Sequence, residues 1–515
     1  TPSVLLSIPA DRALAGLSGI GASADEMAQA MYQNVLAWED VLYVANQVQG
    51  IVPAGGARTD SYRYPMSTRQ NIRYMRMFAG AFMYAAGDHV GIGYGSCSGM
   101  AAGKPISQLE TGASANRLFG WGIAHEIGHN MDKLGRAEIT NNIYSLMVQT
   151  YDGGQNTLPS RLERSNKYAA IFNKVAQGYP GASNDVFVQL GMYWQLHLAY
   201  DTGSDPMDFY HRFFQAWKAG TYFDGASAYD DKVALTAAGV AGRDLSEFFL
   251  RWGMTLSEST RNTLASYPGE DRAIWYLNDG SRRDALAGAS ESAGTVAVEA
   301  SLQNNNEIVL NITPSITGGI QGYEIRRNGT PVGFTTETTY TDTVGQGNHR
   351  TYEYSVAAYD TLGNEICTGR AGQVRVAYDK LVDASAYQAV REGGSVVFTF
   401  TQPTPVSGLK LTGADRPADG VYKVDIETSV TGADGTEVLR SVTACEGSFD
   451  AGNLATDDAY LVYFNKPGSA GTGDTRIWTY DARTITVEGI PAEMPLEDVR
   501  LVAYAEDDIA FPDGG

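Results

Sequence analysis

The chain has 515 residues, which exceeds the size that one hydrophobic core usually serves, so two to four domains are expected. Hydrophobic residues make up 43% and charged residues 19% of the chain, a balance that excludes an intrinsically disordered protein. The formal net charge of -21 argues against a nucleic-acid partner, because contact with phosphates needs Lys and Arg. No apolar run reaches the roughly 18 residues of a membrane span, so no transmembrane segment is predicted.

The first predicted domain covers residues 1–285 and is mostly helical. From about residue 24 to residue 265, apolar residues recur at helical spacing, as in the run MAQAMYQNVLAWEDVLYVANQV. Short strand-like pieces such as HVGIGYG, at residues 89–95, interrupt this pattern. The sequence therefore predicts a mostly helical α+β domain with a small sheet.

One helix of this domain carries the pattern HExxH, in which His125 and His129 are four residues apart. Imidazoles one helical turn apart can both bind a single Zn²⁺ at about 2.0–2.1 Å, so one Zn²⁺ per chain is the predicted cofactor. Glu126 lies about 100° around the helix from His125, where its carboxylate can accept a proton from the attacking water as general base. An apolar stripe on the opposite face is expected to pack on the core, and it comprises Phe119, Ile123, Ile127 and Met131.

A catalytic zinc site needs a third protein ligand and an open position for water. The next carboxylates are Asp132, on the same helix, and Glu138, which follows a break at Gly135. Glu138 is the predicted ligand, because it starts a second helical pattern that returns the chain toward the two histidines. Asn142, one turn further on, is predicted to hydrogen-bond a liganding imidazole and to fix its tautomer.

A tetrahedral intermediate also needs a hydrogen-bond donor besides the metal. Tyr193, His197 and His211 are candidates, because each follows the zinc ligands within the helical region. No spacing selects among them, and a buried Tyr or a hydrogen-bonded core His is more often structural. The donor therefore stays open at this point.

After about residue 293 the apolar pattern changes from helical spacing to strict alternation, which is typical of strands. Residues 293–378 have the size of a seven-stranded β-sandwich and resemble a fibronectin type III module. Within them the Asn328-Gly329 pair predicts a type I′ hairpin turn. Residues 380–515 continue with strand-like runs separated by Gly, Pro and Asp, and predict a second all-β sandwich module.

Four sequence blocks in the first domain resemble those of one known family. The blocks are GWGIAHEIGHNMD, the following AEITNNIYSLMVQ, the upstream GDHVGIGYG and the downstream DLSEFFLRWGMTLS. They are similar to the M60-like (enhancin-like) metallopeptidases, a gluzincin group, and the similarity covers about residues 1–280. It implies that His125, His129 and Glu138 bind zinc and that Glu126 is catalytic. The expected fold is a gluzincin-type domain followed by two all-β sandwich modules.

The same resemblance implies a substrate class. Members of the family act on mucins and other O-glycoproteins, and several cut just before a glycosylated Ser or Thr. Such enzymes commonly carry fibronectin-like and carbohydrate-binding modules, so glycans are expected partners of the β modules. The resemblance also implies a secreted or cell-surface protein of a host-associated bacterium.

The segment HVGIGYG precedes the active-site helix, where gluzincins place an edge strand that pairs with the substrate backbone. Gly91 and Gly93 permit the close approach of another chain, and Tyr94 follows them, so these three residues are candidates for substrate binding. The alternative is an ordinary sheet strand with a bulge.

Three functions are thus compatible with the sequence. The first is a zinc endopeptidase specific for O-glycosylated proteins, and the second is a broader mucin-degrading protease without a glycan requirement. The third is a glycan-binding adhesin whose peptidase domain is inert. The intact HExxH pattern and Glu138 argue against inertness, and turnover on a defined peptide separates the three.

Overall fold

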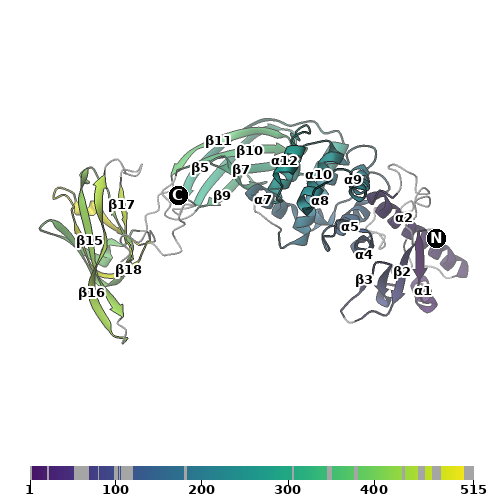
Figure 1. Cartoon of the computed structure of the whole chain (residues 1–515), viewed down its shortest axis with the longest axis horizontal. Coiled ribbons are helices and arrows are strands. Elements are labelled where there is room, and N and C mark those ends of the chain that lie inside the picture. The colour runs from purple at the N-terminus through teal and green to yellow at the C-terminus, as the bar shows by residue number, and fades with distance from the viewer. Residues whose placement is uncertain are drawn as a thin grey trace. The chain divides into compact units, whose positions relative to one another are not determined.

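The structure is a computed structural model that divides into two compact units. The first unit comprises Thr1–Val298, Ile312–Thr339 and Tyr354–Ala371, and the second comprises Glu299–Asn311, Tyr340–Glu353 and Gly372–Gly515. The residues described are 3–19, 23–51, 69–78, 80–97, 103, 105, 120–178, 183–303, 307–344, 351–375, 381–431, 435–450, 459–466 and 477–503. Figure 1 labels many of their helices and strands.

A small sheet lies near the N-terminus of the first unit. Its strands are β1 (Val4–Ser7), β2 (Gln70–Met75), β3 (Met83–Ala85) and β4 (His89–Gly93). They are ordered β1-β2-β4-β3, with β1, β2 and β4 parallel and β3 antiparallel to β4. The strand β3 is therefore one edge of the sheet, and it packs against the helix α4.

The rest of this region is helical, in agreement with the apolar spacing. The described helices are α1 (Ala10–Leu17), α2 (Ala24–Val48), α4 (Trp121–Met131), α5 (Asn142–Thr150), α6 (Arg161–Arg164), α7 (Tyr168–Gln177), α8 (Val186–Tyr200), α9 (Asp208–Ala219), α10 (Tyr229–Ala241), α11 (Ser246–Arg251), α12 (Glu258–Leu264) and α13 (Asp279–Leu286). Among the described residues, no helix has the length and apolar character needed to cross a membrane.

Local signals explain where two of these helices begin. Ser23 and Glu26 form a capping box at the start of α2, in which each side chain binds the other residue's backbone N–H. Asp185 accepts hydrogen bonds from the backbone of Phe187 and Val188 at the start of α8. Most of α8 is buried, including Trp194, which is consistent with its nearly continuous apolar sequence. This helix packs against α5, α7, α9 and α13.

The region after α13 forms strands, as the alternating pattern predicted. They are β5 (Ala293–Gln303), β6 (Glu307–Thr317), β7 (Ile320–Arg327), β8 (Thr330–Thr335), β9 (Thr339–Thr343), β10 (Thr351–Asp360) and β11 (Glu365–Arg375). One sheet has the order β5-β6-β9 and the other β11-β10-β7-β8. Asn328 and Gly329 join β7 to β8 with φ values of 48° and 82°, which confirms the predicted turn, because a type I′ turn needs two positive φ angles. The fibronectin type III assignment stays a prediction.

The strands β8 and β10 share a hydrophobic core with the helices of the first unit. Phe334 on β8 contacts the rings of Phe172 and Tyr276, at centroid distances of 5.1 and 4.2 Å. The buried carboxylate of Glu324 on β7 accepts hydrogen bonds from Arg251 and Tyr276, both at 2.6 Å. Helices and strands thus stabilise one another here, and the domain boundary expected between residues 285 and 293 stays a prediction.

The second unit has its own core and an all-β structure, in agreement with the strand pattern after residue 380. Its further strands are β12 (Tyr387–Glu392), β13 (Ser395–Val406), β14 (Gly408–Leu411), β15 (Asp419–Thr431), β16 (Glu437–Asp450), β17 (Tyr460–Tyr463), β18 (Tyr480–Glu488) and β19 (Val499–Val502). They form sheets of order β12-β13-β18-β15-β16 and β17-β14-β19. Whether this part binds glycans stays a prediction.

Candidate metal centre

The two faces of the helix α4 differ in burial, as the spacing of its residues predicted. Ile123, Ile127 and Met131 are buried in the core, whereas His125 and His129 are half-buried on the other side. Phe119, the fourth member of the predicted apolar stripe, lies outside the described residues. The histidines are therefore fixed by a packed helix and still reach solvent.

A glycine within the HExxH pattern allows α4 to approach the chain just before α5. A Cβ atom at Gly128 would lie only 2.2 Å from the main-chain oxygen of Asn141. Any other residue would push this segment away, because real Cβ atoms do not approach backbone oxygens so closely. The glycine thus brings Asn141 and Asn142 beside the two histidines.

The loop between α4 and α5 is held by Asp132. Its carboxylate accepts hydrogen bonds from the backbone of Leu134 and Gly135, both at 3.0 Å, and from the hydroxyl of Thr140 at 2.7 Å. These bonds use Asp132 as a structural acceptor of the loop. The helix α4 ends at Met131, so Asp132 lies just past its end and not on the helix as expected, and Gly135, with a φ of 75°, lies within the loop that follows.

Glu138 lies in this loop and is not the start of a helix, so that part of the sequence prediction is wrong. The helix α5 begins four residues later, at Asn142, and Glu138 has a left-handed backbone with a φ of 66°. Few non-glycine residues adopt this conformation, which costs energy unless the surroundings hold it. The side-chain amide of Asn142 helps to hold this conformation, because it donates a hydrogen bond to the main-chain oxygen of Glu138 at 2.7 Å.

Three side chains converge between the loop and α4. The His125 Nε2 and Glu138 Oε2 atoms are 3.4 Å apart, His129 Nε2 and Glu138 Oε1 are 3.1 Å apart, and the two Nε2 atoms are 3.1 Å apart. Ligands at about 2.0–2.1 Å from a tetrahedral Zn²⁺ are separated by about 3.3 Å. The nitrogen and carboxylate donors and their spacing therefore fit a zinc ion. Their role as ligands stays a prediction.

Two asparagines surround the histidines. The Asn142 Oδ1 atom lies 2.7 Å from His125 Nδ1, so a proton on Nδ1 can be donated to it while Nε2 faces the other ligands. The sequence predicted this contact. It did not single out Asn141, whose amide nitrogen is 3.3 Å from His129 Nε2 and 3.4 Å from the main-chain oxygen of His125. Only the adjacent Asn-Asn pair in the sequence gives a hint of this second residue.

The predicted general base, Glu126, is half-buried next to His125. Burial raises the pKa of its carboxyl, the neighbouring His125 opposes this rise, and Glu138 adds to it. A raised pKa makes the carboxylate a stronger proton acceptor. Burial also lowers the pKa of His129 and thus favours the neutral imidazole that a metal ligand needs.

The segment HVGIGYG does not form the edge strand that was expected. Gly91 and Gly93 lie in β4, which pairs with β2 on one side and β3 on the other. Both sides of this strand are therefore paired within the sheet and not open to a substrate. A Cβ at Gly91 would lie 2.1 Å from the ring of Tyr84, which explains this glycine by packing. Tyr94 follows in a short 3₁₀ helix, with Arg12 over its ring. The edge of the sheet next to α4 is β3, which is too short to stand out in the sequence.

The three candidate donors differ in their surroundings. His197 is fully buried, 2.6 Å from the carboxylate of Asp201, and His211 is buried with Nδ1 3.2 Å from the main-chain oxygen of Gln47. These contacts give both histidines structural roles in the core. Tyr193 differs, because it lines a pocket and its hydroxyl lies 2.9 Å from that of Tyr229.

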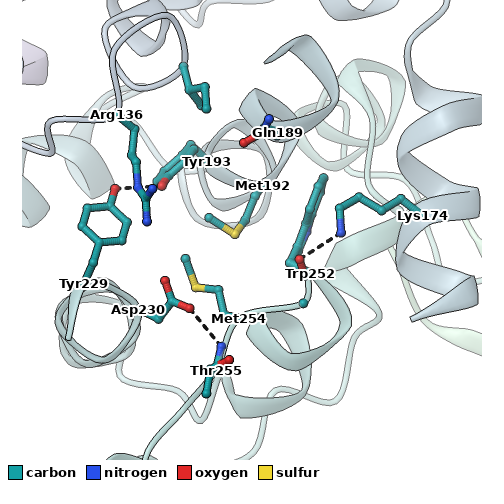
Figure 2. Close-up of a pocket in the computed structure, with 12 residues that line it drawn as sticks. Arg136, Lys174, Gln189, Met192, Tyr193, Tyr229, Asp230, Trp252, Met254 and Thr255 are labelled. Atoms are coloured by element: carbon teal, nitrogen blue, oxygen red, sulfur yellow. Dashed lines mark hydrogen bonds between the residues drawn. The ribbon is translucent and has the colours of Figure 1, made fainter. Parts of the chain in front are cut away.

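This pocket lies beside the loop that carries Glu138 and has a volume of about 360 Å³. It is lined by Arg136, Ile139, Lys174, Gln189, Met192, Tyr193, Tyr229, Asp230, Trp252, Gly253, Met254 and Thr255, which are drawn in Figure 2 and most of them labelled. Burial raises the pKa of the Tyr229 hydroxyl to about 12, so it is protonated at neutral pH. The pocket combines residues from five separate segments, and no short motif predicts such a combination.

The chain is similar to known proteins in sequence and in structure. Residues 25–253 match the model of peptidase M60, enhancin and enhancin-like proteins, and no curated protein matches the chain. Among solved structures, the catalytic module of the metalloprotease ZmpA from Clostridium perfringens is 22% identical, with 73% of this chain and 66% of that chain covered and a TM-score of 0.50. This likeness indicates a shared fold.

Two further structures from Clostridium perfringens are similar. The M60 catalytic domain of ZmpC, solved in complex with the sialyl T antigen, is 24% identical over 67% of this chain and 63% of its own, with a TM-score of 0.49. A ZmpB structure with two CBM32 domains and the M60 domain is 26% identical, with a TM-score of 0.48. The match covers 66% of this chain and 34% of that chain. The chain thus spans less than two thirds of the length of either protein.

Proposed function

Residues 25–253 of this chain form a domain of the peptidase M60 family, and on this premise we propose that it is a secreted zinc endopeptidase of O-glycosylated, mucin-type proteins. We further propose that it cuts just before a Ser or Thr that carries O-linked N-acetylgalactosamine. The observation that carries the proposed activity is the convergence of His125, His129 and Glu138 with the spacing of zinc ligands. The substrate class is supported by the resemblance of the sequence to the family.

In this proposal the side chains have separate tasks. His125, His129 and Glu138 hold the ion, which when bound supplies a Lewis acid for the scissile carbonyl and acidifies water. Glu126 accepts the proton of the attacking water and passes it to the leaving amine. Asn142 keeps the Nδ1 proton of His125 in place, so that Nε2 stays available.

The edge strand β3 is the proposed binding site for the substrate backbone. Phe82 and Ala86, on either side of β3, are bonded to β4, since the Phe82 oxygen accepts from Gly93 at 2.8 Å and the Ala86 nitrogen donates to His89 at 3.0 Å. Antiparallel strands alternate the direction of these groups, so Met83 and Ala85 direct their backbone groups to the outer edge. An extended peptide can add there as a further strand, beside α4.

A pair of matched peptides tests the proposal. One is a defined O-glycopeptide, the other its unglycosylated twin, and mass spectrometry locates the cut. We expect cleavage directly before the glycosylated residue, with a preference for the glycopeptide of up to about 10⁴-fold, because polar groups built for sugar hydroxyls are left unpaired by the bare peptide. Glu126→Gln is the inactive control.

The other outcomes of this experiment select the alternatives. Comparable kcat/KM on both peptides would contradict the glycan requirement and favour a broader mucin-degrading protease. Absence of turnover on both peptides and on whole mucin, in protein loaded with zinc, would favour a glycan-binding adhesin with an inert peptidase domain.

A further inference from the structure

The strand β3 packs against the helix α4, and contacts at both ends of the strand hold it there (Figure 1). Near the start of α4, a Cβ atom at Gly122 would lie 3.1 Å from the Met83 Sδ atom, so the Met83 side chain packs on this glycine. Near the end of α4, the Asn130 Oδ1 atom accepts a hydrogen bond at 2.7 Å from the backbone of Gly87, in the turn after β3. The helix therefore contacts the strand at its beginning and just past its end.

The two contacts are spaced alike along the helix and along the strand. Gly122 and Asn130 are eight residues apart, which is about 12 Å at a rise of about 1.5 Å per helical residue. Met83 and Gly87 are four residues apart, which is at most about 13 Å at about 3.3 Å per residue of extended chain. Because the two lengths agree, β3 can run beside α4 from one contact to the other.

The proposed general base lies midway between these contacts. Residues four apart on a helix share one face, so Gly122, Glu126 and Asn130 form one stripe of α4. The two ends of this stripe hold the β3 segment, and its middle residue is Glu126. The position of β3 therefore sets how far a peptide that adds to its outer edge lies from the Glu126 carboxylate.

Asn130 joins α4 to three points of the sheet. Besides accepting from Gly87, its side-chain amide donates to the main-chain oxygen of His89 at 3.2 Å and to the Gln70 Oε1 atom at 3.3 Å. The His89 oxygen also accepts from the Ala86 nitrogen at 3.0 Å, so Asn130 binds the same turn that ends β3. One asparagine amide, with its acceptor and two donors, thus links the helix to β2, to β4 and to the turn between β3 and β4.

The hairpin of β3 and β4 is also held by contacts of its own. The Tyr84 hydroxyl on β3 lies 2.8 Å from His89 Nε2 on β4, and His89 Nδ1 lies 2.8 Å from a carboxylate oxygen of Asp88. The Tyr84 ring packs on Gly91, where a Cβ atom would lie 2.1 Å from it. These contacts join the two strands into one unit, so a displacement of the turn moves β3 with it.

We propose that Asn130 is a positioning residue, which holds the β3 edge where a bound peptide meets Glu126. The role of β3 as the substrate edge comes from the proposed function, on which this inference rests. Without the Asn130 side chain the hairpin loses two hydrogen bonds to the helix, and β3 shifts relative to Glu126. Reacting groups must lie within about 3–3.5 Å of each other, and a misplacement of about 1 Å can cost about 10²-fold in rate.

Steady-state kinetics on the glycopeptide test this role in Asn130→Ala. We expect kcat to fall by about 10- to 100-fold with KM within about threefold, because the outer edge of β3 still pairs with the peptide but presents it at the wrong distance. Zinc per chain should match the wild type, and so should inhibition by acetohydroxamic acid, a small zinc-binding probe that needs no edge strand. Counting kcat per site that binds this probe removes any effect of an unfolded fraction.

Asn130→Asp is the second variant, because its side chain has nearly the same size and keeps an acceptor for the backbone of Gly87. It places a carboxylate oxygen against the main-chain oxygen of His89, where the amide donated before. The two acceptors repel each other, so kcat should fall by about tenfold or more in this variant too.

Asn173→Ala is the matched control. Asn173 on α7 accepts from the backbone of Phe334 on β8 at 3.2 Å, so it also joins a helix to a strand, and both asparagines are half-buried. Its loss should lower stability as the loss of Asn130 does but leave kcat within about twofold. If Asn130→Ala and Asn173→Ala both match the wild type in kcat, or if both lose it equally, Asn130 does not position the edge and the inference is overturned.

Hydrogen exchange separates this inference from the proposed function, because it needs no turnover. Over residues 83–89, followed by mass spectrometry, exchange should become about tenfold faster in Asn130→Ala and stay unchanged in Asn173→Ala. Unchanged exchange in Asn130→Ala would overturn the inference even if the wild type is active. If the wild type cuts neither peptide while exchange rises in Asn130→Ala alone, the proposed function fails and the placement of the hairpin by Asn130 stands.

Discussion

Two histidine sites in the helical region use the same residue types in opposite surroundings. His197 and Asp201 are one turn apart on and just after α8, 2.6 Å from each other and fully enclosed. His125 and His129 are also one turn apart, yet their side chains are 18% and 26% exposed and face Glu138, which is 59% exposed. The first site is closed, and the second has three donors that converge beside solvent.

This difference teaches that residue type and spacing do not by themselves identify a functional site. In the closed site, burial lowers the pKa of His197 and raises that of Asp201, so both groups are disfavoured as ions. Arg282 ties this site to the core by donating to the main-chain oxygen of Asp201 at 2.7 Å. A metal or substrate could reach such a pair only if the core opened. The predictions below test this contrast, beginning with the largest effect.

Removing Glu138 should abolish the metal site. Glu138→Ala is expected to lose most of its zinc on dialysis, because one of three ligands is gone, while an exposed side chain contributes little to folding. Metal content per chain, by atomic absorption, measures the effect. Asp132→Ala is the control, since Asp132 holds the loop and should lower the unfolding free energy by about 1–3 kcal/mol without loss of zinc. Equal zinc loss in the two variants would contradict the ligand assignment.

Changing Glu126 should remove turnover and leave the metal. Glu126→Gln keeps the size of the side chain but cannot accept the proton, so kcat on the glycopeptide should fall by about 10² to 10⁴-fold. Zinc content and melting temperature should match those of the wild type. Activity within tenfold of the wild type would show that another group acts as the base.

The sequence predicted that His125, His129 and Glu138 would lie close together, because most of that site is local, whereas the roles of these residues stay predictions. His125, Glu126 and His129 are placed by one amphipathic helix, and helical periodicity is readable from apolar spacing. Asn142 was found in the same way. The left-handed backbone of Glu138 was not predicted, because it results from the loop bonds around Asp132 and from Asn142, which pattern reasoning does not see.

Features that depend on several distant segments escaped the sequence. The edge strand β3 has three residues, fewer than a pattern of alternation needs to be recognised, so the neighbouring β4 was taken as the edge instead. The pocket joins residues as far apart as Arg136 and Thr255. His197 and His211 looked like possible donors because burial and hydrogen-bond partners cannot be read from their positions in the chain.

The closed site should matter for stability alone. Asp201→Ala removes the partner of His197 and an acceptor for the backbone of Phe209, at 2.7 Å, so the unfolding free energy should fall by about 1–3 kcal/mol for each of the two buried groups left unpaired. Zinc per folded chain should not change. Asp208→Ala, which breaks the exposed pair with Arg212, should cost about 0.5 kcal/mol at most. Denaturant unfolding measures both, and a loss of zinc from folded Asp201→Ala would contradict the separation of the two sites.

The smallest effect is expected at Asn142, which supports the open site without being a ligand. Asn142→Ala removes the acceptor for the Nδ1 proton of His125 and the donor to the main-chain oxygen of Glu138, so zinc affinity should fall by about 10- to 100-fold. Competition with a chelator measures it. Ser145→Ala removes only a weaker contact to Asn142, at 3.2 Å, and should change affinity by less than about threefold. Similar affinities in Asn142→Ala and the wild type would mean that α4 and the loop already orient both ligands, and that the asparagine serves the packing of α5 alone.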